Sequence, residues 1–437
     1  MTIRMDEGAA ELLDTLHRAG YAAYVVGGCV RDSLLGLTPH DWDLCTSALP
    51  QQGMELFGEE KCIPTGLQHG TVTVKQGGGL YEITTFRTEG AYTDGRHPDE
   101  VHFVPDVRED LARRDFTINA MAYNAKEGLI DPFGGQADLQ SGILRAVGVP
   151  HQRFTEDALR ILRLYRFAAR FGFAIDPPTA QAAQELCAHL DCVSVERIEE
   201  ELAKLLSAPA PAAYLDEKIL SVVLPELSPE ALAAAKPVVD ACPAGEQALP
   251  VRLAALLLSL GEDGTRRTLR RLRCSNACIE ETAVLVREVV SGVPGAFSSD
   301  TNRAIPSPAL LPAATGSHPS GRSSEKLPAR PPVSLNIYTR KLLGQYGLKT
   351  VQRLAALGTA LQPEHAADFA ALSELAERLD ADGVCCRVSQ LAVNGRDLMA
   401  AGVPAGPGIR KVLEALLDGV IREEYPNERQ ALLAAVQ

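Results

Sequence analysis

The spacing of apolar residues changes after the first third of this chain, and that change limits the folds open to it. Before the change, runs rich in β-branched and aromatic residues end at Gly, Asp or Pro, which predicts strands at 21–26, 71–74, 80–86 and 101–104. From Phe154 onward, Leu, Ala, Arg and Glu recur at helical spacing and strand patterns nearly vanish. We therefore predict an α+β chain, with a small mixed sheet near the start and helices throughout the rest.

Length and composition narrow the possibilities further. The 437 residues are too many for one compact core, and no run of about 18 apolar residues could span a bilayer. The start lacks the pattern of an export signal, and the ten scattered cysteines form no zinc-type pairs, so we expect a cytoplasmic protein without membrane contact. The net charge of −13 argues on average against nucleic acid, but a local basic track would still bind RNA.

One segment interrupts the helical part of the chain. Residues 291–334 are dense in Pro, Ser and Gly and have no apolar period. Such a segment buries too little surface to offset the entropy of ordering it. We therefore predict a disordered insertion or linker, whose role the pattern does not indicate.

The most informative stretch is residues 24–47, YVVGGCVRDSLLGLTPHDWDLCTS. A predicted strand ends in Gly27-Gly28 and a short helix follows directly. Glycines at such a turn let backbone amides approach an anion, and the helix N-terminus adds positive partial charge. Arg31 on the first turn could hold a phosphate bidentately. A tight connection between core elements is the alternative for this turn taken alone.

Two carboxylates, Asp41 and Asp43, follow the turn in a D-x-D pattern. In a strand, residues i and i+2 point to the same face, so the two carboxylates would repel each other without a cation between them. Mg²⁺ takes oxygen ligands and is usually held by one or two carboxylates plus substrate phosphates. Together, turn and carboxylates predict a metal–triphosphate site, with a solvated edge strand as the alternative.

These motifs, with four more in order, resemble the class II branch of the polymerase β nucleotidyltransferase superfamily. That branch contains bacterial and eukaryotic CCA-adding enzymes and bacterial poly(A) polymerases. The four are RRDFTINAM (113–121), DPFGG (131–135), EDALRILRLYRF (156–167) and SVERIEEEL (194–202). They look like the family's ribose-selecting motif, its hinge, its nucleotide-reading helix and the motif that steadies that helix.

The resemblance implies roles for individual residues in a phosphate and metal site. Gly28 and Arg31 would contact the triphosphate, and Asp41 and Asp43 would hold Mg²⁺. Glu82 is a candidate third carboxylate near the metal, and an ion pair between Glu82 and Arg87 is an alternative that explains this residue nearly as well.

A sugar site is implied as well. Arg114 and Asp115 would hold the incoming ribose, with Asp115 accepting from the 2′-OH and so favouring ribonucleotides.

The segment 154–172 is predicted to be one helix, with Thr155 as its N-cap and Gly172 just past its end. Four arginines share an arc of this helix, which alone could be a solvated basic face. These four are Arg160, Arg163, Arg166 and Arg170. The resemblance implies that Asp157 and Arg160 read the base, while Arg163 and Arg166 extend the contacts to the nucleotide.

Three features bear on which reaction of the branch this chain performs. Residues 63–76 are mild in charge, whereas poly(A) polymerases of the branch carry an Arg/Lys-rich segment there. Residues 87–103 resemble the flexible loop that full CCA-adding enzymes carry and CC-only enzymes lack. Residues 249–264 have no His-Asp pair, so no attached phosphohydrolase is expected.

We therefore expect template-independent addition or repair of the 3′-terminal CCA of tRNA from CTP and ATP, by two-metal nucleotidyl transfer that releases pyrophosphate. The alternatives are a poly(A) polymerase, a CC- or A-adding enzyme, and a non-catalytic RNA-binding relative, against which the intact carboxylate pair argues. The expected domains are a catalytic head (1–150), a neck with the reading helices (151–205), a helical body (206–290), the linker (291–334) and a tRNA-binding helical tail (335–437).

Overall fold

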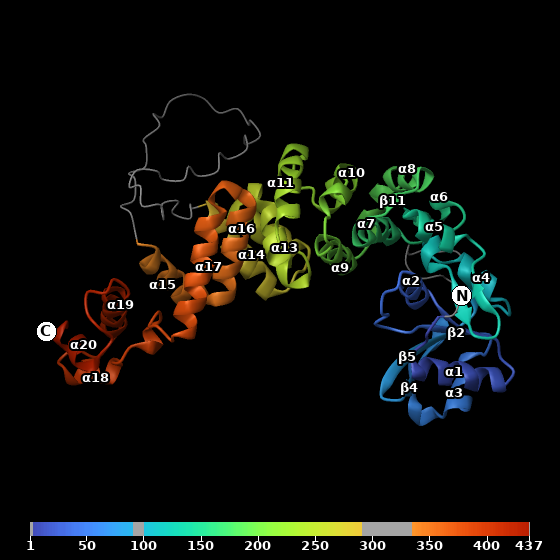
Figure 1. The fold of residues 1–437 in the computed structure, drawn as a ribbon, viewed down its shortest axis with the longest axis horizontal. Helices are drawn as coiled ribbons and strands as arrows, with labels where there is room; N and C mark the ends of the chain where they lie inside the picture. Colours follow the sequence, from blue (N-terminus) through green and yellow to red (C-terminus); the bar gives the residue numbers. More distant parts are fainter. Residues whose placement is uncertain (1–2, 91–99, 291–333, 437) are drawn as a thin grey trace. The chain divides into compact units, whose positions relative to one another are not determined.

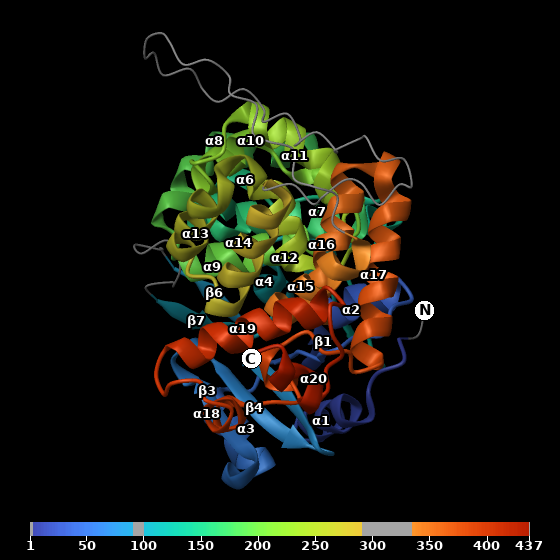
Figure 2. The ribbon, with the colours of Figure 1, turned by 90° about the vertical axis from the view of Figure 1, so that its left-hand side faces the viewer.

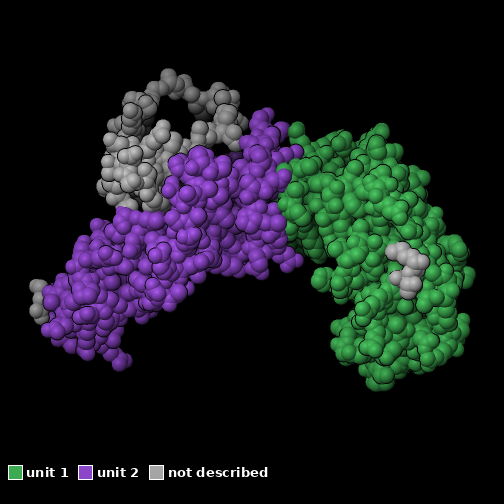
Figure 3. All heavy atoms as spheres, in the orientation of Figure 1, with its two compact units in different colours: residues 1–225 green, residues 226–437 purple. Residues whose placement is uncertain are grey.

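The computed structural model describes residues 3–90, 100–290 and 334–436. It divides into two compact units, residues 1–225 and 226–437, coloured separately in Figure 3. The first unit holds the sheet and the helices that follow it through α10, and the second unit is helical (Figure 1). The finer division into head, neck, body and tail stays a prediction. Nearly all of the predicted linker, residues 291–333, and residues 91–99 of the predicted loop lie outside the described residues.

The first unit is built on a seven-stranded mixed sheet of order β3-β4-β5-β2-β1-β8-β9. The pair β2–β5 is parallel and the other neighbours are antiparallel. Two further sheets have two strands each, β6 with β7 and β10 with β11. All the strands of the unit's described part are β1 (Ala23–Val26), β2 (Leu44–Thr46), β3 (Cys62–Gly66), β4 (Thr71–Gln76), β5 (Gly79–Thr85), β6 (Arg87–Glu89), β7 (Val101–Phe103), β8 (Ala122–Asn124), β9 (Gly128–Ile130), β10 (Ile143–Leu144) and β11 (Ala174–Ile175). The predicted α+β class with a small mixed sheet is confirmed.

The sheet has one covered and one open face around β5. Along this strand Tyr81 and Ile83 are buried, while Glu82 between them is exposed, as the alternation of a half-buried strand requires. The Tyr81 hydroxyl donates to Asp6, the N-cap of α1, so α1 lies on the buried face. Glu82 consequently points to the opposite, open face.

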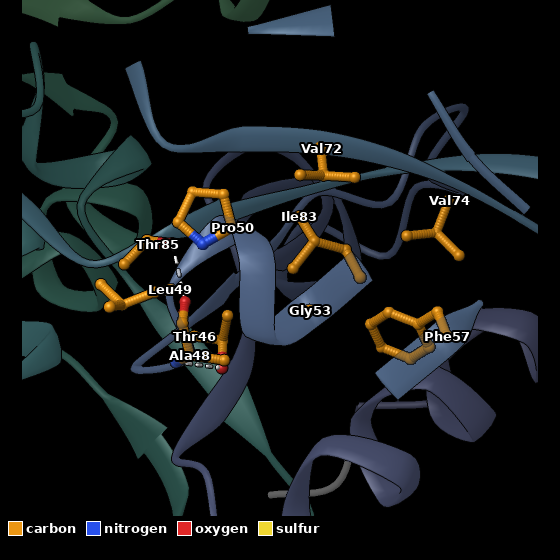
Figure 4. A pocket seen from close by; sticks show the side chains of 10 residues that line it. All are labelled: Thr46, Ala48, Leu49, Pro50, Gly53, Phe57, Val72, Val74, Ile83 and Thr85. Atoms are coloured by element: carbon orange, nitrogen blue, oxygen red, sulfur yellow. Dashed lines mark hydrogen bonds between the residues drawn. The ribbon is translucent and has the colours of Figure 1, made fainter. Parts of the chain in front are cut away.

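Helix α3 covers the same buried face further along the strands. A small apolar pocket lies between α3 and the strands β4 and β5 (Figure 4). Phe57 and Pro50 of α3 line it together with Val72, Val74 and Ile83 from the sheet. This packing commits one face of the sheet to the core and leaves the polar side chains on the other.

The helices of the first unit are α1 (Glu7–Arg18), α2 (Gly28–Leu34), α3 (Pro50–Phe57), α4 (Val107–Ala112), α5 (Gly135–Ser141), α6 (Pro150–Glu156), α7 (Leu159–Phe171), α8 (Pro177–Glu185), α9 (Val195–Leu206) and α10 (Glu217–Val223). Helix α7 packs along α9. A short 3₁₀ turn, Thr117–Asn119, lies within the predicted ribose-selecting motif.

The predicted single helix over 154–172 is wrong, because the chain breaks between α6 and α7. Asp157 is extended, with φ −145° and ψ 104°, and its Oδ1 accepts from Leu159 N at 3.0 Å. Asp is well suited to such a local bond and therefore competes with the helix. Thr155 is not an N-cap but lies in the last turn of α6, whereas Gly172 ends α7 with φ 69°, as predicted.

The second unit consists of helices in its described part, α11 (Pro229–Ala241), α12 (Leu249–Leu257), α13 (Gly261–Arg271), α14 (Asn276–Val290), α15 (Leu335–Tyr346), α16 (Leu348–Leu361), α17 (Ala366–Ala381), α18 (Gly395–Ala400), α19 (Gly408–Ile421) and α20 (Arg429–Ala434). The last three share an apolar cluster around Leu398, Leu416 and Leu432, and they gather near the C-terminus in both views (Figures 1 and 2). No helix among residues 3–90, 100–290 and 334–436 has the length and apolar character needed to cross a membrane.

Candidate functional site

The glycine turn at the end of β1 leads directly into α2. Gly27 has a φ of 78°, which a residue with a side chain rarely adopts, and α2 begins at Gly28. A Cβ on Gly27 would lie 3.0 Å from Nη1 of Arg114. The turn thus requires glycine both for its backbone angle and for the close approach of this guanidinium.

The two carboxylates of the D-x-D motif lie just before β2 and not within a strand, so the predicted strand is wrong in extent. Pairing of β2 with its neighbours begins only at Leu44. Both Asp41 and Asp43 are exposed. Because β2 runs parallel to β5 with Leu44 opposite Ile83, Asp43 lies beside Glu82 at the same edge.

The electrostatics of this edge suit a cation. Although Asp43 reaches the surface, lost hydration raises its pKa; Arg114 opposes this, and the charges of Glu82 and Asp41 raise it further. In the described part of the chain Glu82 forms no ion pair, with Arg87 or otherwise.

The described residues hold no group of three His, Cys, Asp or Glu side chains that could by itself bind a metal. What they offer is an exposed carboxylate pair with a third carboxylate near it. Such an open set fits Mg²⁺, which usually keeps several waters and takes further oxygens from substrate phosphates.

Arg114 lies between the glycine turn and the carboxylates. Its Nη2 donates to Asp110 at 3.3 Å, and its charge lowers the pKa of Asp43. Its buried Nε has no hydrogen-bond partner within the described ranges. A buried donor without an acceptor is costly, so Arg114 has bonding capacity that its neighbours in the fold leave unused.

Arg31 is only 4% exposed and is held on several sides. Its Nε donates to Asp32 at 2.8 Å and its Nη1 to Asn119 at 2.6 Å. Its Cζ lies 5.2 Å from the ring centroid of Phe167 and 4.9 Å from that of Phe171, both on α7. A phosphate bound to Arg31 would have to share the guanidinium with these partners.

Asp115 is buried, and its carboxylate accepts four hydrogen bonds from three residues. Its Oδ1 accepts from Phe116 N at 2.8 Å and from Asn119 at 3.0 Å. Its Oδ2 accepts from Nε and Nη2 of Arg163 at 2.9 and 2.6 Å. Despite the opposing effect of burial, Arg163 and the bond from Asn119 hold the pKa of Asp115 well below its usual range.

The predicted base-reading pair lies at the break between α6 and α7. Oδ2 of Asp157 accepts from Arg197 of α9 at 2.8 Å. Arg160 donates to Glu156 at 2.7 Å and to the main-chain oxygen of Arg113 at 3.1 Å. The structure therefore brings the acceptor and the donor to the same break and holds each by a further side chain.

The other arginines of α7 are also bound. Arg166 donates to Glu201 of α9 at 2.5 Å, and Arg163 lies 3.8 Å from the same carboxylate. Arg170 lies 3.5 Å from Asp32. Each arginine in the basic arc thus contacts a carboxylate, and only Arg170 at its end is exposed to solvent.

The side chains that hold the predicted residues but were not singled out from the sequence include Asp32, Asp110, Asn119, Glu156, Arg197 and Glu201. The last two belong to the 194–202 motif expected to steady the reading helix. Their motif was therefore visible, but not their contacts, which join residues about 35 to 40 positions apart.

Three family models match the chain. Residues 23–145 match the poly A polymerase head domain and residues 172–230 a probable RNA and SrmB-binding site of polymerase A. Residues 337–436 match a putative tRNA nucleotidyltransferase domain 2. A CCA-adding enzyme from Lactiplantibacillus plantarum is 36% identical over 436 residues, covering 98% of this chain and 95% of the relative.

The chain belongs to the family of bacterial class II CCA-adding enzymes. A CCA-adding enzyme of Bacillus stearothermophilus, solved in complex with CTP, is 31% identical and superposes with a TM-score of 0.77 over 99% of this chain and 97% of that one. The Thermotoga maritima enzyme complexed with tRNA, at 20% identity and a TM-score of 0.63 over 99% and 96%, shares the fold. Nucleotidyltransferases of this family generally use divalent metal ions.

Proposed function

We propose that this chain adds or repairs the 3′-terminal CCA of tRNA without a nucleic-acid template, using CTP and ATP and releasing pyrophosphate. The observation that carries the proposal is the exposed carboxylate pair Asp41 and Asp43, of which Asp43 lies beside Glu82 and within the electrostatic reach of Arg114. Close identity to CCA-adding enzymes over nearly the whole chain supports the choice of reaction. Catalysis of this kind needs positioning and charge, and no covalent intermediate.

Asp41 and Asp43 are the proposed holders of Mg²⁺. Of two metal ions bound there, one would activate the 3′-OH of the primer and the other would neutralise the leaving pyrophosphate during in-line attack on the α-phosphorus. Glu82 adds negative charge at the same edge, and Arg114 balances part of it.

The remaining residues of the head are proposed to bind the triphosphate and the sugar. Amides of the turn at Gly28 and the guanidinium of Arg31 would contact the phosphates. The side chain of Arg114, which is 20% exposed and lies beside the glycine turn, is proposed to contact the ribose. Asp115, kept ionised by Arg163, would accept from the 2′-OH and so favour ribonucleotides.

Base selection is proposed to rest on Asp157 and Arg160. A carboxylate only accepts and a guanidinium only donates. Cytosine offers its amino group to the acceptor and N3 to the donor, and adenine offers its amino group and N1. Uracil and guanine present an oxygen to the carboxylate and an N–H to the guanidinium, and each mismatch would cost about 1–3 kcal/mol. Arg163 and Arg166 would extend the contacts from the same helix.

Partners and location follow from the same reaction. The relative solved with CTP supports CTP as a ligand of this chain, and the match of residues 337–436 to a tRNA nucleotidyltransferase domain supports tRNA contacts in the second unit. The cytoplasm is the proposed compartment, because none of the ten cysteines forms a disulfide in the described chain.

The test is incorporation of labelled nucleotides into tRNA transcripts that end before C74, before C75 or before A76. With Mg²⁺, CTP alone should add only the C residues, and CTP plus ATP should complete the CCA. Addition of A alone to a generic RNA would instead identify a poly(A) polymerase, the name carried by the head-domain match. No incorporation into any substrate would contradict the proposal.

A further inference from the structure

Asn119 lies between the two parts of the nucleotide site that bind phosphate and sugar. It is 7% exposed and ends the 3₁₀ turn Thr117–Asn119. Its Oδ1 accepts from Arg31 at 2.6 Å and its Nδ2 donates to Asp115 at 3.0 Å. Arg31 has only donors and Asp115 only acceptors, so the amide has a single workable orientation.

The bonds to the two oxygens of Asp115 are not equivalent. Oδ1 is held by Phe116 N and by Asn119, both of which are buried. Oδ2 is held by Arg163, whose side chain is 33% exposed. An incoming hydroxyl could therefore share Oδ2 with Arg163 while Oδ1 keeps its two internal partners.

Arg31 gives Asn119 a rigid anchor. Besides its bonds to Asp32, its guanidinium lies over the rings of Phe167 and Phe171 on α7. An arginine desolvated and stacked in this way loses little further freedom on binding an acceptor. The amide of Asn119 is thus fixed from one side and fixes Asp115 from the other.

We propose that Asn119 is a positioning residue for sugar selection, holding Oδ1 of Asp115 so that Oδ2 faces the ribose 2′-OH. This rests on the proposed role of Asp115 as the acceptor of that hydroxyl. Without the bond from Asn119, Oδ1 keeps only Phe116 N as an internal partner, so the carboxylate is fixed less firmly and the hydrogen bond to the 2′-OH weakens. A deoxynucleotide never makes that bond, so its binding does not depend on Asn119 in the same way.

The substitution Asn119→Asp separates the two bonds of the amide. It keeps an acceptor for Arg31 but sets a second carboxylate against Asp115 where a donor was. The affinity for CTP should fall, and the affinity for dCTP should change little. The ratio of CTP affinity to dCTP affinity should therefore fall roughly tenfold or more, as expected for a hydrogen bond to a charged group. Asn119→Ala, which adds no charge, should lower the ratio in the same direction.

The experiment measures binding of CTP and dCTP to the full-length protein with Mg²⁺ and without RNA, by titration calorimetry. Asn124→Asp is the matched control, since Asn124 is a buried asparagine of the same unit whose amide bonds to Ala23 O. Circular dichroism of each variant checks its fold. The control should keep the wild-type ratio even if it melts earlier.

An equal loss of affinity for both nucleotides in the Asn119 variants would overturn the inference, because a merely structural residue would act that way. Equal affinities of the wild type for CTP and dCTP would overturn it as well. Binding without RNA is independent of transfer, so the proposed function can fail separately. In that case the wild type would prefer CTP over dCTP yet add nothing to tRNA.

Discussion

Neighbouring groups have opposing effects on the pKa of Asp43. Lost hydration raises its pKa, and the charges of Glu82 and Asp41 add to that effect, while Arg114 alone among the named groups opposes them. In the absence of a cation the negative charge of Asp43 destabilises the fold. A bound cation would remove the repulsion, so metal binding and stability should be linked at this residue.

Asp43→Asn should therefore abolish nucleotide transfer and leave the metal-free protein at least as stable as the wild type. The amide removes the repulsion but is a poor ligand for Mg²⁺. Thermal melts with and without Mg²⁺ check this: the metal should raise the melting temperature of the wild type and not of the variant. Transfer by Asp43→Asn or by Asp41→Asn at the wild-type rate would remove the metal assignment.

The lowered pKa of Asp115 predicts that the stability of the protein depends on pH. Its pKa is lowered in the folded state, so its contribution is present above its unfolded pKa of about 3.9 and is lost as the pH falls through the lower folded value. Asp115→Asn should be less stable than the wild type near pH 7, by roughly 1–3 kcal/mol. The difference should shrink below about pH 4, because the wild type then loses the same interaction.

Urea unfolding at a series of pH values would measure this difference. Asp14→Asn is the control, since Asp14 forms an exposed ion pair with Arg18 on α1 and should change stability little at any pH. A difference between Asp115→Asn and the wild type that does not vary with pH would contradict the account of Asp115.

Residues near one another in sequence were accessible to prediction, and their distant partners were not. The spacing of Asp41 and Asp43 predicted a shared metal site, and the structure exposes both carboxylates just before β2, although the strand geometry assumed for them was wrong. That Glu82 lies beside Asp43 depends on the parallel pairing of β2 with β5, for which neither strand carries a sequence signal. The bond between Arg31 and Asn119 spans 88 positions and depends on the whole fold.

At the scale of elements, the break between α6 and α7 shapes the proposed base-reading site. It leaves Asp157 outside both helices, where its carboxylate accepts from Leu159 N at the start of α7 and from Arg197. Periodicity could predict the helical character of this segment but not the break, because every residue around Asp157 is compatible with a helix. The end at Gly172 was predictable, since glycine tolerates the positive φ found there.

Asp157→Ala and Arg160→Ala should relax base selection, letting UTP or GTP enter while lowering the use of CTP and ATP. Each substitution removes one partner that a wrong base would leave unpaired, a penalty of about 1–3 kcal/mol. Single-nucleotide incorporation with each of the four triphosphates measures the change.

Arg170→Ala is the matched control for these variants, because Arg170 lies on the same helix but pairs with Asp32, away from the break. It should keep the preference for C and A. Wild-type selectivity in both Asp157→Ala and Arg160→Ala would mean that these residues do not read the base.

For the whole molecule, the two units divide the proposed work. All residues proposed to bind the metal and the nucleotide belong to residues 1–225, which have their own sheet and core. The match to a tRNA nucleotidyltransferase domain lies at 337–436, within the second unit. The net charge of −13 makes nonspecific attraction to RNA weak, so the binding of tRNA should depend on local contacts in both units.

A fragment ending at Pro225 should therefore bind CTP about as tightly as the full chain and bind tRNA much more weakly. Its CTP site needs no residue of the second unit, whereas each lost phosphate contact lowers RNA affinity and flattens its dependence on salt, by a slope of about 0.7–0.9 per contact. Calorimetry with CTP and filter binding of tRNA at several salt concentrations measure both quantities. Asp157→Ala in the full chain is the opposite case, since it should alter nucleotide selection and leave the salt slope for tRNA unchanged. If the fragment kept full tRNA affinity, the second unit would have another role; if it folded but lost CTP, the nucleotide site would extend beyond the residues proposed to form it.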